Sequence, residues 1–323
     1  MIKVHNLAKV FGTKRAVDDI SFSVERGEVL GFLGPNGAGK STSMRMITGF
    51  IPPSAGTVTV GGFDTIQNPI EARRLIGYLP ENAPAYTDMT VHGFLNFCAE
   101  IRGLRGDARK KAVSRVVEMC FLEAVLDQSV ETLSKGYRHR TCFAQSIIHD
   151  PDVLVLDEPT DGLDPNQKHE VRGLIRRMGE KKAIIFSTHI LEEVDAVCSR
   201  AIIIDRGKIV ANGTPSELRQ RSEWAGAVTV RISGVNASVL NQKLGQLASV
   251  KRTSILKEDS ASVTARVFPK SANVNGALAR HIAEAAQGWH IEELHTEEGR
   301  LDEVFRSITM PDTAASPAKP TTS

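Results

Sequence analysis

Residues Gly34-Pro35-Asn36-Gly37-Ala38-Gly39-Lys40-Ser41 fit the pattern G-x-x-x-x-G-K-[ST] of a phosphate-binding P-loop. The apolar run Val29–Leu33 before them is short enough for a buried strand, and Ser41–Ile47 after them reads as the start of a helix. Glycines let the backbone curl so that its N–H groups face an anion, and the helix adds the positive end of its dipole. An ordinary glycine-rich turn is the alternative, but it does not explain a lysine and a serine in register with three glycines. We therefore expect a site for a nucleoside triphosphate with Mg²⁺, in which Lys40 contacts the β- and γ-phosphates and Ser41 ligates the metal.

The bulk properties are those of a globular protein without a strong charge bias. The chain has 323 residues, enough for two domains, with 41% hydrophobic and 24% charged residues. A formal net charge of +2 is too small to predict nucleic acid as the main partner. No apolar run reaches the length of a membrane span and no signal peptide opens the chain, which predicts a cytoplasmic protein. The four cysteines are far apart, so we expect reduced and mostly buried thiols.

A second element of the site follows the apolar run Val153–Leu156. Such continuous runs are typical of central parallel strands, and functional side chains gather where these strands end. Asp157 has the position of an aspartate that holds Mg²⁺, and Glu158 would lie closer to the γ-phosphate, where it orients or activates the attacking water. A plain acidic turn is the alternative, which the upstream P-loop disfavours.

Three further features are weak signals when each is taken alone. Phe11 closes a strand before a glycine turn, where it either stacks on an adenine or packs in the core. Ser134 and Gly136 stand at a helix start, a second possible anion site. His189 ends a buried strand, where it either donates to a phosphate or is structural.

Taken together, the order of these motifs resembles the nucleotide-binding subunit of an ABC transporter over about residues 1–220. Leu301-Asp302-Glu303-Val304-Phe305 also resembles the C-terminal end of the multidrug, polysaccharide and gliding-motility exporter type. The matching motifs in chain order are Gly34–Ser41, Leu79-Pro80-Glu81, Leu133-Ser134-Lys135-Gly136-Tyr137, Val153–Glu158, Gly162-Leu163-Asp164-Pro165 and Ser187-Thr188-His189.

The resemblance implies a role for each residue in an ATP site. It makes Glu158, His189 and Lys40 catalytic, and places Ser41, Glu81 and Asp157 around Mg²⁺. It implies that Ser134 and Gly136 contact the ATP of a second copy in a head-to-tail dimer, with Asp164 at the interface. The expected ATP-binding residues are Phe11, Gly34, Pro35, Asn36, Gly37, Ala38, Gly39, Lys40, Ser41 and Thr42, with Ser134 and Gly136 from the partner.

This chain departs from the family pattern at two informative positions. Glu81 stands where the family usually has glutamine, so it keeps an acceptor oxygen and adds a negative charge near the triphosphate. Lys135 replaces a glycine of the signature, where it either holds the partner's ATP or is a solvated charge. Arg138 and Arg140 are expected at the surface or paired with acids.

The expected fold class is α/β, a P-loop NTPase of the ABC ATPase type with a mainly parallel core sheet and an antiparallel β subdomain. The ATP-binding domain would cover residues 1–222, with a helical subdomain at about 84–150 in which Asp107 caps the second helix. Residues 226–310 follow a β-α-β-β-α-β order, with a helix at 272–286, and predict a small ferredoxin-like α+β domain. Residues 311–323 have the composition of a disordered tail.

The resemblance implies an ATPase subunit that powers a membrane exporter. The partners would be a separate permease, docked near residues 84–105, and a second copy of the chain, with the protein peripheral on the inner face of the membrane. The alternative is an ABC-type mechanochemical ATPase acting on DNA or ribosomes. The interval from Lys40 to Ser134 has no room for the long coiled coil of DNA-acting relatives, and the chain has one cassette where ribosome-acting relatives have two. A non-hydrolysing regulator is disfavoured because Lys40, Glu158 and His189 are all present.

Overall fold

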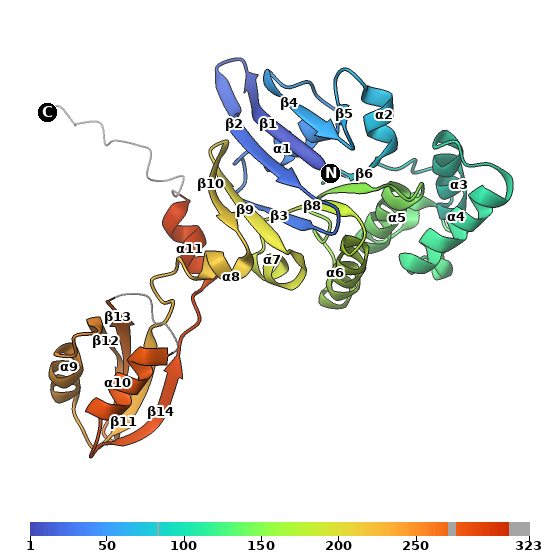
Figure 1. Cartoon of the computed structure of the whole chain (residues 1–323). Coiled ribbons are helices and arrows are strands. Elements are labelled where there is room, and N and C mark those ends of the chain that lie inside the picture. Colours follow the sequence, from blue (N-terminus) through green and yellow to red (C-terminus); the bar gives the residue numbers. More distant parts are fainter. Residues whose placement is uncertain (83, 271–275, 310–323) are drawn as a thin grey trace, which may run out of the picture. The chain divides into compact units, whose positions relative to one another are not determined.

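The computed structural model of the chain describes residues 1–82, 84–270 and 276–309 (Figure 1). Its contacts divide the chain into two compact units, one of Met1–Pro215 and one from Ser216 onward. The division falls before residue 222, where the sequence pattern sets the end of the ATP-binding domain. Each unit has its own hydrophobic core and is described separately.

A six-stranded sheet with the strand order β10-β9-β3-β8-β7-β6 forms the centre of the first unit. All neighbouring strands are parallel except β10, which pairs antiparallel with β9. Every residue of β3, β7 and β8 is buried, as continuous apolar runs predict for central parallel strands. The mainly parallel α/β core expected from the sequence is confirmed. The strands are β3 (Val29–Leu33), β6 (Ile76–Leu79), β7 (Val153–Asp157), β8 (Ala183–Thr188), β9 (Arg200–Asp205) and β10 (Lys208–Gly213).

An antiparallel sheet with the order β2-β1-β4-β5 packs over the helix that follows the P-loop. Helix α1 (Lys40–Ile47) buries Met44, Met46 and Ile47 in a core shared with both sheets. The strands are β1 (Ile2–Phe11), β2 (Lys14–Val24), β4 (Ala55–Val60) and β5 (Phe63–Asp64). Figure 1 shows α1 lying between this sheet and the central sheet. The P-loop is therefore held from two sides.

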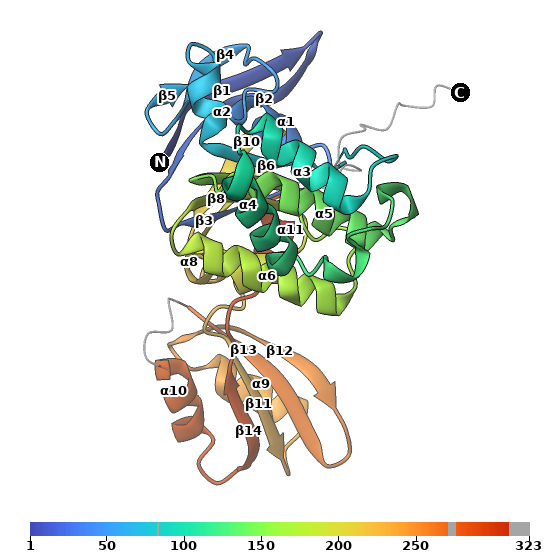
Figure 2. The ribbon, with the colours of Figure 1, turned by 90° about the vertical axis from the view of Figure 1, so that its right-hand side faces the viewer.

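The expected helical subdomain is formed by α3 (Val91–Ile101), α4 (Gly106–Met119) and α5 (Lys135–Ile147), which pack on one another (Figure 2). The prediction that Asp107 caps α4 is wrong, because Arg105 is the N-cap and Asp107 lies in the first turn. A carboxylate in the first turn also favours a helix through the dipole, which explains the error of two residues. The remaining helices of the unit are α2 (Pro69–Arg74), α6 (Pro165–Gly179) and α7 (Leu191–Val197), with short 3-10 turns at Glu123–Val125 and Val130–Thr132.

The second unit contains an antiparallel sheet with the order β12-β13-β11-β14, and its core is closed by Leu240, Leu244, Leu278 and Ile282 of two helices. The expected α+β architecture is confirmed. The elements are β11 (Val228–Ser233), α9 (Ala237–Gly245), β12 (Val250–Glu258), β13 (Ser262–Pro269), α10 (Ala277–Ala285) and β14 (His290–Thr296). Helices α8 (Pro215–Arg219) and α11 (Leu301–Ile308) flank them in the chain. Part of the helix expected at 272–286, and the tail at 311–323, lie outside the described residues.

Two sequence expectations concern the whole chain. All four cysteines are buried and none is in a disulfide, as expected. Within the described residues, no helix is both long and apolar enough to cross a membrane.

Candidate active site

The P-loop connects the buried strand β3 to helix α1, and two glycines explain why its backbone takes this path. Gly39 caps α1 in a left-handed conformation with φ of 110°, and a Cβ there would lie 2.6 Å from the Ala16 carbonyl oxygen. A Cβ on Gly34 would lie 2.4 Å from the Ile204 carbonyl oxygen. Real Cβ atoms do not approach backbone this closely, so neither position accepts a side chain without a backbone shift.

A cavity of about 460 Å³ opens over this loop. Its lining combines P-loop atoms with side chains from three distant parts of the sequence. The lining residues are Phe11, Lys14, Ala16, Asn36, Gly37, Gly39, Lys40, Ser41, Thr42, Glu81 and Glu158. Nine of these are residues that the sequence predicted for the site. The fold therefore brings predicted residues as far apart in the sequence as Phe11 and Glu158 to one cavity. Gly34, Pro35 and Ala38 shape the loop without lining the cavity.

Phe11 is 50% exposed at the end of β1, which excludes the core-packing alternative. Lys9 Nζ lies 5.2 Å from the centre of its ring. An exposed aromatic face at the rim of a phosphate-binding cavity is suited to stacking on a planar base.

Lys40 is buried and points along the P-loop. Its Nζ donates to the Gly34 carbonyl at 2.8 Å and to the Pro35 carbonyl at 3.3 Å, and it lies 3.7 Å from Glu158 Oε1. The ammonium group is therefore desolvated and held between the loop and the carboxylate, where its attraction for phosphate oxygens is weakly screened.

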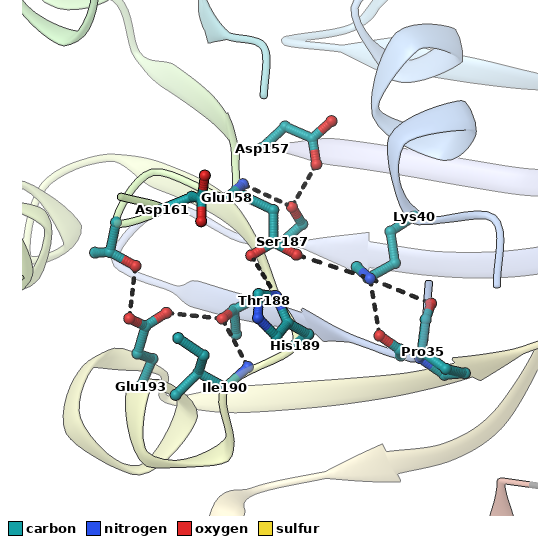
Figure 3. Close-up of polar contacts among 12 residues, drawn as sticks. Pro35, Lys40, Asp157, Glu158, Asp161, Ser187, Thr188, His189, Ile190 and Glu193 are labelled. Atoms are coloured by element: carbon teal, nitrogen blue, oxygen red, sulfur yellow. Dashed lines mark hydrogen bonds and ion pairs between the residues drawn. The ribbon is translucent and has the colours of Figure 1, made fainter. Parts of the chain in front are cut away.

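Glu158 lies at the centre of the charged groups, between Lys40 and His189 (Figure 3). Its Oε2 is 3.0 Å from His189 Nδ1, and its backbone N–H donates to Ser187 Oγ at 3.0 Å. The residue has a left-handed backbone with φ of 51°, which is uncommon for a side chain of this size. Strain of this kind is tolerated where the surrounding contacts hold a functional group in place.

The Glu158 carboxyl has a raised pKa because burial penalises its charged form. The hydrogen bond from His189 and the charge of Lys40 oppose this shift without cancelling it. A carboxylate that is partly desolvated and still paired with two donors is a better proton acceptor than an exposed one.

Asp157 ends β7 and is buried, and its Oδ1 accepts from Ser187 Oγ at 2.5 Å. Ser41 and Glu81 line the same cavity. A hydroxyl and carboxylates are hard oxygen donors of the kind that Mg²⁺ takes, and this cation usually completes its shell with water and phosphate. The donor set therefore fits Mg²⁺ bound together with a triphosphate. Within the described residues, no group of three His, Cys, Asp or Glu side chains forms a metal site on its own.

Ser134 and Gly136 lie at the start of α5, and neither lines the cavity among the described residues. Ser134 is the N-cap and accepts from the Tyr137 N–H at 3.3 Å. A Cβ on Gly136 would lie 2.4 Å from Gln167 Oε1, so the signature turn packs against α6. Asp164 caps α6, accepting from the Gln167 N–H at 3.0 Å. One chain thus brings the P-loop, Glu158 and His189 together but leaves the signature apart from them.

Lys135, the unusual residue of the signature, pairs with Asp161 at 2.9 Å in the same chain. Both side chains are exposed, and the nearby ammonium group lowers the pKa of Asp161. Arg140 is buried and lies 3.5 Å from Glu170, as an acid-paired residue, whereas Arg138 is partly exposed. Within one chain, Lys135 is therefore an exposed charge at a helix start that pairs with Asp161.

Sequence reasoning missed Lys14, Ala16 and Ser187. Lys14 and Ala16 line the cavity because β2 turns back directly after Phe11, and only the short turn Gly12-Thr13 indicated this. Ser187 lies opposite Asp157 in the paired strands β7 and β8. Its position at a strand end, directly before Thr188-His189, could have identified Ser187 as a site residue from the sequence.

Comparison with known proteins agrees with this geometry. A family model described as ABC transporter matches residues 17–161. The linearmycin resistance ATP-binding protein LnrL of Bacillus subtilis is 31% identical over 311 residues, covering 96% of this chain and 98% of that protein. The Nod factor export ATP-binding protein I of Ralstonia nicotianae is 37% identical over 249 residues, covering 77% of each chain.

A solved structure gives the same result. A structure described as the ATP-binding subunit of an ABC transporter superposes with a TM-score of 0.64 at 27% identity. The match covers 68% of this chain and 92% of that one.

Proposed function

Because this chain belongs to the ABC transporter family and is one of its ATP-binding, ATP-hydrolysing subunits, we propose that it powers a separate membrane permease by closing on a second copy of itself around ATP. The observation that carries the proposal is the position of Glu158 between Lys40 and His189 at the edge of the P-loop cavity. A phosphate-binding lysine and a residue that orients the attacking water are recurring parts of enzymes that hydrolyse a terminal phosphate.

In the proposed mechanism, Phe11 stacks on the adenine and the P-loop N–H groups bind the phosphates. Lys40 leaves the Gly34 and Pro35 carbonyls to contact the β- and γ-phosphates. Glu158 orients water for attack on the γ-phosphorus and accepts its proton, while the bond from phosphorus to the β–γ bridging oxygen breaks. His189, held by Glu158, donates to the transferring group. Ser41, together with Asp157 and Glu81, would hold Mg²⁺, which would supply positive charge to the phosphates.

The dimer is proposed because the site of one chain is incomplete. Ser134 and Gly136 belong to the signature, yet they lie outside the described cavity lining. A head-to-tail second copy would bring its Ser134 hydroxyl and Gly136 N–H to the γ-phosphate. Since the phosphate is then part of the interface, hydrolysis would release the two copies.

The proposed docking surface for the permease is a groove of about 1060 Å³ between the helical and core parts of the first unit. It includes part of the expected region 84–105, and Phe50 and Ile101 are 72% and 68% exposed there. Exposed apolar side chains that gather around a groove mark an interaction site. The lining also includes Arg73, Arg74 and Arg102.

Substitution tests this surface directly. Phe50→Asp and Ile101→Asp should abolish co-purification of the permease while ATP binding persists. Val239→Asp is the matched control, since Val239 is 45% exposed in the second unit. Retention of the permease by both groove variants would refute docking at this place.

Export is the proposed direction of transport, and the inner face of the membrane is the proposed location. Support comes from the relatives, whose names refer to linearmycin resistance and Nod factor export. The alternative of a mechanochemical ATPase on DNA or ribosomes is not favoured, because the matching family model is described as ABC transporter and one relative is named for export.

An ATPase assay with site variants tests the proposed chemistry. Purified protein should hydrolyse ATP only with Mg²⁺, Lys40→Met should lose nucleotide binding, and Glu158→Gln should lose hydrolysis but keep binding. Hydrolysis at the wild-type rate by both variants would refute the assigned roles.

A further inference from the structure

Glu193 is a completely buried carboxylate close to the active site, and the chemistry proposed above does not use it. It lies in α7 and is 0% exposed. Its Oε1 accepts from Thr160 Oγ1 at 2.5 Å and from Arg172 Nη2 at 3.0 Å, and its Oε2 accepts from Thr188 Oγ1 at 2.7 Å. Burying a charge costs several kcal/mol unless it is paired and hydrogen-bonded, and these three donors meet that requirement.

The two threonines lie next to the two residues proposed to act on the γ-phosphate. Thr160 is two residues after Glu158, and Thr188 immediately precedes His189. Thr188 Oγ1 also accepts from the Ile190 N–H at 3.0 Å, which closes a turn around His189. Since the Thr188 hydroxyl donates its only proton to Glu193, its lone pairs are free to accept from Ile190. Glu193 therefore fixes the turn on which the His189 ring is carried (Figure 3).

The third partner connects the same carboxylate to another element. Arg172 lies in α6, the helix whose N-cap is Asp164. Its guanidinium balances the charge of Glu193 at a site where water does not reach the carboxylate. Glu193 thus joins three segments that are far apart in the sequence: the loop after β7, the turn after β8, and α6.

We propose that Glu193 is a positioning residue for ATP hydrolysis, holding the Glu158 and His189 segments at the separation that lets these two side chains meet. The inference rests on the function proposed above. Glu193 does not touch the described nucleotide cavity, so its action is through Thr160 and Thr188. Its loss should therefore affect the chemical step and leave ATP binding at the P-loop unchanged.

The test is steady-state ATPase kinetics of the full chain, with nucleotide binding followed by a fluorescent ATP analogue. Glu193→Gln should lower kcat by about 10- to 100-fold, since small displacements of reacting groups have effects of this size. The KM and the analogue affinity should change less than about threefold. Thr188→Val should lose kcat similarly, whereas Thr188→Ser, which keeps the hydroxyl, should restore most of it.

The matched control is Glu28→Gln. Glu28 forms an ion pair with Arg200 at 2.6 Å at the opposite ends of the strands from the P-loop. If this substitution lowers the melting temperature as much as Glu193→Gln but leaves kcat unchanged, stability alone does not explain the loss.

Two results would overturn the inference. One is a folded Glu193→Gln protein with wild-type kcat, and the other is equal kcat for Thr188→Val and Thr188→Ser. Failure of the proposed function is distinguishable, because Glu158→Gln would then hydrolyse ATP normally whatever the Glu193 variants do.

Discussion

Glu158 is the residue on which the account depends most, because three independent features of the structure converge on it. It directly follows the buried strand β7, takes an uncommon left-handed backbone, and lies between a buried ammonium group and an imidazole. Each feature has an energetic cost that packing alone would not require. Because these features coincide at the edge of a phosphate-binding cavity, we assign the role in hydrolysis to Glu158 itself and not only to the motif that contains it.

The raised pKa of Glu158 predicts how its removal changes stability with pH. A carboxyl whose pKa is higher in the folded state favours folding fully below its unfolded pKa and loses that contribution as pH rises through the folded value. Glu158→Gln has no such proton to lose. Its melting temperature relative to wild type should therefore increase between pH 4 and pH 8. A difference that is constant or falls across this range in thermal scans would contradict the raised pKa.

Glu81 should have a weak effect on the Mg²⁺ dependence of ATP hydrolysis, and this effect should come from its charge. It lines the cavity but is exposed, so water and salt screen its field. Glu81→Gln should leave an active enzyme in which half-maximal ATPase needs about two- to fivefold more Mg²⁺, an effect that shrinks in high salt. An unchanged Mg²⁺ titration at low salt would show that the charge at this position does not matter.

At the scale of elements, the connection from β3 to α1 carries the strictest steric demands. Gly39→Ala places a Cβ against the Ala16 carbonyl at a backbone angle that side chains rarely adopt. We expect a loss of about 1–3 kcal/mol in stability and loss of ATP binding. Gly245→Ala in α9 is the control, because a Cβ there meets nothing within 4 Å. Calorimetry with and without ATP separates the two cases, and normal ATP affinity of Gly39→Ala would refute the steric argument.

The sequence predicted best the elements that have a single, unambiguous pattern of residues. The buried strands β3, β7 and β8 were readable because their apolar runs are continuous. The N-cap of α4 was misplaced by two residues, since Asp107 suits both an N-cap and a first turn. Ser187 and Glu193 escaped notice because their partners, Asp157 and Thr160, are distant in sequence and meet only when the strands pair. Lys135 could not be assigned from the sequence for the same reason, as its partner Asp161 lies in the turn between β7 and α6.

At the scale of the whole molecule, one chain brings together most of the residues proposed for the ATP site but not the signature residues Ser134 and Gly136. The P-loop and Glu158 line one cavity, and His189 contacts Glu158, while Ser134 and Gly136 lie at the start of α5 outside the described lining. The second unit has a separate hydrophobic core. A complete site, as proposed, therefore needs a second copy of the chain.

The measurement that tests this requirement most directly is the mass of Glu158→Gln in solution, by size-exclusion chromatography with light scattering. With MgATP the variant should be a dimer of about twice the 35.1 kDa of one chain, and without nucleotide it should be a monomer. Adding Ser134→Arg, which would place a bulky side chain where the partner's phosphate is expected, should return it to a monomer. A Glu158→Gln protein that binds ATP yet stays monomeric at all concentrations would contradict the composite site.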